Sequence, residues 1–225
     1  MASGPDAPTF QQIVTAQQPR LRSEAILETA RDLALARDVR SVSMTAIARA
    51  AGLSRATLLR FFTNREQIFL VLAARAWRDW ADAVEQILPS VSTDSRQLAV
   101  VLTESLVQRP LFCDLMAQAP LNLEYNVSLE TLQEYKLQTV AAAATAGEAV
   151  VAALTRLGLF VSPQTGHELV TMITAQAAMI WQTSHPPQRL AELYTQEAQL
   201  TPAAIEFAPH MVRFISLLIM GHGGD

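Results

Sequence analysis

Apolar residues recur at helical spacing along almost the whole chain, and prolines and glycines mark where each run stops. The first run contains Ile26, Ala30 and Leu33, and a later run, VAAAATAGEAVVAAL, lies within a segment from about 124 to 157. No stretch alternates apolar and polar residues as a half-buried strand does. Eight glycines and eleven prolines are few for 225 residues, which favours long helices over a turn-rich all-β fold. We therefore predict an all-α fold with about nine or ten helices.

The apolar spacing and the positions of the prolines and glycines predict nine helical segments. One opens after Ser54, and the others span about 23–38, 44–51, 63–88, 94–108, 111–118, 124–157, 167–183 and 202–220. Ser43 and Ser54 are expected N-caps, and either Thr63 or Asn64 can cap the long fourth segment. Residues 1–19 have neither a basic start nor a compact apolar run, so we expect a disordered tail rather than a signal peptide.

Charge is distributed unevenly along the chain. The formal net charge is −4 at pH 7, but residues 20–66 carry nine arginines against five carboxylates, and residues 67–225 are acidic. A basic end on an acidic body predicts contact with a polyanion at that end. Scattered, solvated arginines are the alternative interpretation.

Residues 43–62 have the spacing of a helix-turn-helix. Two short helices joined by a tight turn need a small residue at their contact, a residue that tolerates positive φ, and an apolar plug. Ala48, Gly52 and Leu58 fit these three roles, glycine because it lacks a Cβ. Ile47 and Phe62 extend the apolar wedge. Other helical hairpins can match so short a pattern.

The surrounding sequence, ILETARDLALARDVRSVSMTAIARAAGLSRATLLRFFTNREQIFLVL, resembles the N-terminal domain of the TetR family of transcriptional regulators. The resemblance covers residues 20–72 and includes MTAIARAAGLS, TLLRFF and NREQIF in the family's order. It implies a three-helix DNA-binding head over residues 20–66 and a larger helical effector-binding and dimerisation body over residues 67–225. We use "head" and "body" for these two ranges. It also implies a homodimer whose heads bind adjacent major grooves of a double-stranded, palindromic operator. The single cysteine and the lack of a signal-peptide pattern favour a cytoplasmic location.

The resemblance also assigns DNA contacts. The recognition helix corresponds to Ser54–Phe61. The expected contact residues are Thr45, Ser54, Arg55, Ala56, Thr57, Leu59, Arg60, Phe61 and Arg65.

Departures from the family pattern affect this assignment. Ala56 stands where the family commonly has glycine or proline, and Leu59 occupies the place of a frequent tyrosine that bonds phosphate. Phe61 likewise replaces a position that is often polar. Leucine can offer only apolar contact, so we expect Arg55 and Arg60 to contribute more of the DNA contact. Packing of Leu59 in the core of the head is the alternative.

The body contains candidates for a small-molecule pocket, because helical bundles hold ligands between apolar and aromatic walls. The candidates are Trp77, Trp80, Phe112, Met116, Met172 and Met179, with Asn122, Asn126 and Gln176 as hydrogen-bonding residues. Each of these side chains could instead pack in the core.

The last helical segment carries a continuous apolar face, with a second face on the long helix before it. The resemblance implies that these helices form a four-helix dimer interface. The candidates are Ala177, Ala178, Trp181, Phe207, Met211, Phe214, Ile215 and Leu218. Burial within one protomer is the alternative.

Enzyme functions find little support. The four histidines share no metal-ligand spacing, and no phosphate-binding glycine loop or nucleophile elbow occurs. The single Cys113 excludes an internal disulfide and is either a packed residue or a reactive thiol. No apolar run reaches the ~20 residues of a membrane span.

We therefore predict a ligand-responsive DNA-binding regulator with no cofactor. The resemblance implies that it is a repressor released by a small effector, and the candidate pocket residues favour an effector that is largely apolar. The alternative is a helical protein-interaction or ligand-sensing module that does not bind DNA. The identities of the effector and the operator stay open.

Overall fold

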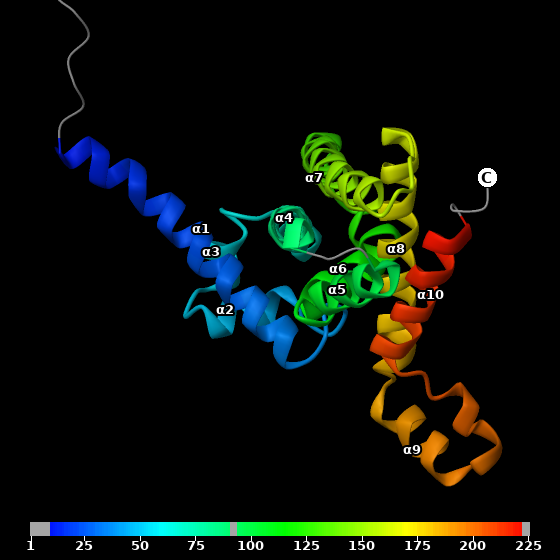
Figure 1. The fold of residues 1–225 in the computed structure, drawn as a ribbon. Coiled ribbons are helices and arrows are strands. Elements are labelled where there is room, and N and C mark those ends of the chain that lie inside the picture. The colour runs from blue at the N-terminus through cyan, green and yellow to red at the C-terminus, as the bar shows by residue number, and fades with distance from the viewer. Residues whose placement is uncertain (1–9, 91–93, 222–225) are drawn as a thin grey trace, which may run out of the picture.

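The computed structural model describes residues 10–90 and 94–221, and these residues form ten α-helices and no strand (Figure 1). The all-α prediction is confirmed. The α-helices are α1 (Phe10–Ala36), α2 (Met44–Ala50), α3 (Arg55–Leu58), α4 (Arg65–Ile87), α5 (Ser95–Val107), α6 (Pro110–Gln118), α7 (Leu129–Arg156), α8 (Pro163–Ser184), α9 (Gln188–Gln196) and α10 (Phe207–Gly221). Three shorter elements are the 3-10 turns η1 (Leu88–Ser90) and η3 (Ala198–Ala203) and the π-helical turn η2 (Ala119–Leu123).

The helix starts follow the predicted capping chemistry. Ser43 Oγ accepts from the Ala46 N–H at 3.2 Å, and Ser54 Oγ accepts from the Thr57 N–H at 3.1 Å. For α4 the cap is Asn64, whose side chain accepts from the Gln67 N–H at 2.9 Å. Each cap satisfies an N–H group that has no partner within its own helix.

Several helix bounds differ from the predicted ones. α1 begins at Phe10 and runs through Pro19, so residues 10–19 are helical rather than a tail. That stretch contains four glutamines and no glycine, which is compatible with a helix. Residues 1–9 lie outside the described part of the chain. α7 begins at Leu129, about five residues later than predicted, because η2 and a bend precede it.

The helix α9 was not predicted from the sequence. It follows the proline pair at 186–187 and, with η3, projects from the end of the bundle where α8 stops (Figure 1). None of its residues is buried. Its short apolar pattern therefore reflects a helix that lies against little else in the protomer.

The helices form two groups joined by α4. Figure 1 shows α1–α3 on one side of the molecule, with α4 between them and the body helices. In the body, α7 packs against α4 and α8, α6 packs against α8, and α10 packs against α5 and α8. α4 therefore belongs to both groups, since its first turn closes the head and its remaining length is a core helix of the body.

An aromatic cluster lies at the centre of the body core. Trp80 stacks on Phe112 with ring centroids 5.3 Å apart, and Trp77 meets both rings edge-on. The indole N–H of Trp80 donates to Ser105 Oγ at 3.0 Å, so the buried donor is satisfied. Cys113 packs in the same core, and burial raises the pKa of its thiol to about 12. Cys113 is therefore a packed residue and not a reactive thiolate near neutral pH.

The core of the head includes residues from the body. Leu115 of α6, Ala119 and Leu123 of η2, and Tyr135 of α7 belong to one buried apolar cluster with Ile26, Leu58 and the other head residues. The segment α6–η2 therefore packs against the head on one side and remains part of the body through α8.

α7 is long and apolar enough to cross a membrane by length and composition alone. In this bundle it contributes Ala142, Ala146 and Val150 to the core between α4 and α8. A core helix of a helical bundle passes the same test, so one such helix is weak evidence for a membrane protein.

α7 and α8 approach closely where two glycines face each other. A Cβ built on Gly147 would lie 3.2 Å from the backbone of Gly166, and a Cβ built on Gly166 would lie 2.7 Å from the Gly147 carbonyl oxygen. Backbone atoms cannot rotate away as a side chain can. The crossing therefore requires glycine, and it fixes two helices that also form walls of the ligand cavity described below.

We expect Gly166→Ala to lower the free energy of unfolding by about 1–3 kcal/mol, because the new methyl group forces α7 and α8 apart. Urea denaturation followed by circular dichroism measures this loss. Gly221→Ala is the matched control, since a Cβ there meets nothing within 4 Å. Equal stability of the two variants would contradict the tight crossing.

Candidate nucleic-acid interface and ligand cavity

Gly52 makes the turn of the helix-turn-helix. Its φ is +66°, a conformation that favours glycine, and the Leu53 N–H donates to the Ala48 carbonyl at 2.9 Å across the turn. Ile47, Ala48 and Leu58 are buried, so α2 and α3 pack through the residues that the spacing predicted. The turn thus holds α3 at a fixed angle on the surface of the head.

The side chains of α3 divide between the surface and the core. Arg55, Ala56 and Arg60 are exposed, and Leu59 is 45% exposed. Neither the Arg55 nor the Arg60 guanidinium makes a hydrogen bond or ion pair within residues 10–90 and 94–221. Phe61 is half-buried and packs against the core of the head. The exposed surface after the turn therefore combines two free guanidinium groups with one apolar side chain.

The predicted recognition helix is shorter than expected. Regular α-helix spans only Arg55–Leu58, and bonds from the Arg60 and Phe61 N–H groups to the carbonyls of residues 57 and 58 continue it as turns. The Ser54 and Thr57 hydroxyls bond each other at 2.8 Å. Thr45 is exposed in the first turn of α2. Thr45 and the α3 surface therefore remain open to a partner.

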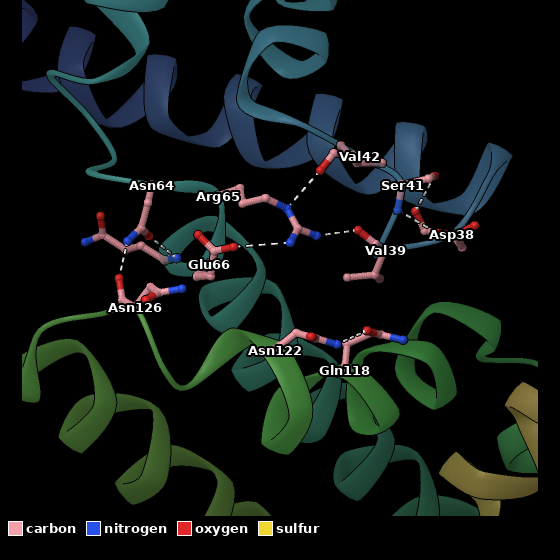
Figure 2. A network of polar contacts seen from close by, with 11 residues as sticks. Asp38, Val39, Ser41, Val42, Asn64, Arg65, Glu66, Gln118, Asn122 and Asn126 are labelled. Atoms are coloured by element: carbon pink, nitrogen blue, oxygen red, sulfur yellow. Dashed lines mark hydrogen bonds and ion pairs between the residues drawn. The ribbon is translucent and has the colours of Figure 1, made fainter.

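Arg65 binds within the protein, in a way that differs from the expected phosphate contact. Its Nε donates to the Val42 carbonyl at 2.8 Å, Nη2 donates to the Val39 carbonyl at 2.6 Å, and Nη1 pairs with Glu66 at 3.2 Å (Figure 2). The guanidinium also lies 5.3 Å from the Phe69 ring centroid. Because these groups use all three nitrogens, Arg65 holds the connection between α1 and α2 against the start of α4.

A second link joins α1 to α4. Both terminal nitrogens of Arg75 bond the Glu24 carboxylate, at 2.6 and 2.7 Å. The hydrogen bonds from Arg75 hold the pKa of Glu24 below its usual value. Arg65 and Arg75 thus fix the angle between the head and α4 at two points along the helix.

A cavity of about 630 Å³ lies between α4, α6–η2, α7 and α8. Its lining is mainly apolar and includes three of the predicted pocket residues, Trp77, Met116 and Met179. The volume is in the usual range for small-molecule sites, and such sites combine apolar walls with a few polar groups. The body therefore contains a mainly apolar cavity of a size that suits a small molecule.

The other predicted pocket residues lie outside this cavity. Trp80 and Phe112 are in the aromatic core, so packing accounts for them. Asn122 donates to Gln118 at 2.7 Å, and the Asn126 carbonyl accepts from Asn64 at the start of α4 (Figure 2). On α8, Met172 and Gln176 are absent from the lining.

Several lining residues were not predicted. His167, Thr171 and Gln182 line the cavity from α8, and Lys136, which pairs with Glu124 at 2.7 Å, lines it from α7. Burial raises the pKa of the lining Tyr135, so its hydroxyl stays protonated. The i, i+4 series His167–Thr171–Ala175–Met179 was the available signal, since it places polar and apolar residues on one helix face.

The predicted dimer residues are largely used within the protomer. Ala177, Phe207, Met211 and Ile215 are buried in the body core, and Ala178 lines the cavity. Trp181, Phe214 and Leu218 are half-buried against that core. The exposed apolar side chains on α8 and α10 are instead Met172, Met179, Leu217 and Met220.

No group of three potential metal ligands from His, Cys, Asp and Glu occurs within residues 10–90 and 94–221.

A helix-turn-helix head followed by a helical body with an apolar cavity is the architecture of a transcriptional regulator with its own ligand-binding domain. Residues 26–72 match the family model described as bacterial regulatory proteins, tetR family, and residues 74–223 match the tetracyclin repressor-like C-terminal domain. The chain belongs to the TetR family.

Relatives agree with this assignment. Two uncharacterized HTH-type transcriptional regulators from two strains of Mycobacterium tuberculosis are each 33% identical over 93 residues, which is 41% of this chain. The chain spans just under half the length of these curated relatives, 46%.

Solved structures share the fold at low sequence identity. The fatty acid degradation regulator FadR from Bacillus halodurans has a TM-score of 0.55 at 12% identity and covers 89% of this chain and 95% of its own. FadR from Thermus thermophilus in complex with lauroyl-CoA has a TM-score of 0.54 at 17% identity and covers 88% and 93%. RolR in complex with resorcinol has a TM-score of 0.55 at 16% identity and covers 93% and 97%.

Proposed function

We propose that this protein is a cytoplasmic repressor that binds a palindromic operator as a homodimer and is released by a small, largely apolar effector. The observation that carries the proposal is the double role of α6–η2. This segment forms one wall of the cavity and also supplies Leu115, Ala119 and Leu123 to the core of the head. An occupant that moves this wall therefore also moves residues on which the head packs.

The proposed DNA contacts are the exposed residues around the turn. Arg55 and Arg60 have unpaired guanidinium groups, which suit bidentate contact with guanine or phosphate. Leu59 is exposed beside them and can contact a thymine methyl group. Thr45 and Ala56 complete this surface. The internal bonds of Arg65 support a structural role for that residue in place of a phosphate contact.

The proposed effector is mostly apolar with one polar end. Trp77, Met116 and Met179 offer apolar contacts, whereas His167 and Gln182 offer hydrogen bonds. The fold neighbours bind lauroyl-CoA and resorcinol, one ligand with a long apolar chain and one small aromatic ligand. Both are compatible in kind with a mainly apolar cavity.

The proposed dimer contact uses the outer faces of α8 and α10. Met172, Met179, Leu217 and Met220 are exposed on these helices, and burial against a second copy would remove them from water. A two-fold pair of heads is required to bind two half-sites about 34 Å apart.

Selection of duplexes from a random-sequence pool by the full chain, followed by binding at several salt concentrations, tests the proposal. We expect a palindromic consensus, a dimer by native mass spectrometry, and an affinity that falls steeply with salt, with a slope of about −0.9 for each phosphate contacted. Failure to enrich any duplex, or a monomer throughout, would contradict it and favour a ligand-sensing module without DNA.

A further inference from the structure

A buried carboxylate connects the body to the head. Asp114 of α6 is only 6% exposed, and its two oxygens accept different hydrogen bonds. Oδ2 accepts from the Val39 N–H, in the connection between α1 and α2, at 2.7 Å. Oδ1 accepts from Gln182 Nε2, near the end of α8, at 2.9 Å. Since a buried carboxylate is costly without such bonds, both donors are needed to hold it in place.

Val39 is held from two sides. Its N–H donates to Asp114. Its carbonyl accepts from Arg65 Nη2 at 2.6 Å, as Figure 2 shows. Arg65 also bonds the Val42 carbonyl, and the next residue, Ser43, caps α2. A continuous series of hydrogen bonds therefore runs from α8, through Asp114 and Val39, to the start of the helix-turn-helix.

In this series of hydrogen bonds, Gln182 is the residue next to the cavity. It lines the apolar cavity, and it also lines a second hollow of about 490 Å³ between the head and the body, to which Asp114 contributes. Among the residues that the structure describes, Gln182 is the one that lines both hollows. Its amide can donate to Asp114 or to a polar group of a cavity occupant.

We propose that Asp114 is a positioning residue for DNA recognition, and that Gln182 makes the hydrogen bond between Asp114 and Val39 depend on whether the cavity is occupied. An occupant that moves the Gln182 amide away from Asp114 removes the donor to Oδ1, so Asp114 shifts and its bond to Val39 weakens. The connection that leads into α2 then loosens. This mechanism rests on the proposed function, and it acts through the connection between α1 and α2 rather than through movement of α4.

Amide hydrogen exchange on the full chain without DNA tests the link directly. Asparagine has the shape of aspartate but only one acceptor oxygen, so Asp114→Asn loses a charged acceptor. We expect exchange at the Val39 N–H to become about tenfold faster or more, relative to core amides of α7. Asp94→Asn is the matched control, since it changes a carboxylate that caps α5 through the Arg96 N–H at 2.9 Å. Unchanged exchange at Val39 in Asp114→Asn would overturn the proposal.

A double-mutant cycle tests the role of Gln182 without a known effector. Ala178 lines the cavity one helical turn before Gln182, so Ala178→Phe places a ring inside the cavity as a surrogate occupant. We expect Ala178→Phe to accelerate Val39 exchange several-fold in the wild-type background and less than about twofold when Gln182→Leu is already present. Equal effects in both backgrounds would overturn the role of Gln182.

Should Ala178→Phe not fold, Gln182→Leu alone carries the test. We expect it to accelerate Val39 exchange, whereas Gln164→Leu, at an exposed position in the first turn of the same helix, leaves it unchanged. Equal exchange in these two variants would count against Gln182.

DNA binding separates this proposal from the proposed function. With the duplex recovered by selection, we expect Asp114→Asn to weaken binding about tenfold without changing the salt slope, since no phosphate contact is lost. Failure of the wild-type chain to select any duplex would overturn the proposed function. Wild-type binding with equal affinity of Asp114→Asn would overturn only the positioning role of Asp114.

Discussion

Arg55→Ala is expected to weaken operator binding by at least about 30-fold. A bidentate arginine contact contributes roughly 1–3 kcal/mol, and a homodimer loses two of them. Arg55 is exposed at the first position of α3 and its guanidinium makes no bond within the described chain, so truncation of its side chain leaves the free energy of unfolding nearly unchanged. Fluorescence anisotropy with the selected duplex measures the affinity.

Arg96→Ala is the matched control for Arg55. It removes the same charge from an exposed position on α5, far along the chain from the turn. We expect it to change the affinity less than about threefold and to leave the salt slope intact. Equal losses in the two variants would attribute binding to net charge and remove Arg55 from the DNA-contacting surface.

Trp80→Ala is expected to lower the free energy of unfolding by about 3–5 kcal/mol. The side chain is fully buried, stacks on Phe112, and donates to Ser105. Truncation leaves a cavity at the centre of the body and removes these contacts. Natural domains are stable by only about 5–15 kcal/mol. We therefore expect a larger fraction of the variant chains to be unfolded at 37 °C. Urea denaturation followed at 222 nm measures the loss.

Trp80→Phe separates volume from hydrogen bonding. It keeps an aromatic ring against Phe112 and removes the donor to Ser105, whose hydroxyl still donates to the Leu102 carbonyl at 2.7 Å. We expect a loss of about 1–2 kcal/mol, well below that of Trp80→Ala. A loss under about 1 kcal/mol in Trp80→Ala would mean that the aromatic cluster does not stabilise the fold as its burial indicates.

The helix-turn-helix could be predicted because its determinants are local. Gly52 turns the chain, Ser43 and Ser54 cap the flanking helices, and Leu58 fills the space between them. All these roles depend on residues fewer than twenty positions apart. The chemistry of each residue type is therefore enough to identify the motif.

The sequence predicts an apolar cavity in the body, but it does not identify most of the residues that line it. Trp77 and Trp80 are three positions apart on one helix, yet Trp77 lines the cavity and Trp80 is enclosed by the core. Periodicity shows which side of a helix is apolar, but not whether that side meets a neighbouring helix or a hollow. That choice depends on how α6, α7 and α8 are arranged, which involves contacts distant in sequence.

Arg65 makes contacts within the protein that its position in the motif does not indicate. The sequence places it at the start of α4, where a basic residue commonly meets phosphate, but two carbonyl groups of the connection between α1 and α2 are its partners in the structure. Those acceptors lie 23 and 26 residues earlier in the chain. No local pattern indicates this contact.

The apolar cluster shared by α6–η2 and the head bears on how such regulators can be recombined. A chimera cut between residues 72 and 74, where the two family models meet, would keep Ile26 and Leu58 from one parent and take Leu115, Ala119 and Leu123 from the other. The two halves of one cluster would then come from sequences that were never selected together. A graft that transfers residues 110–123 with the head keeps α6–η2 matched to it, and moves the mismatch to the contact with α8.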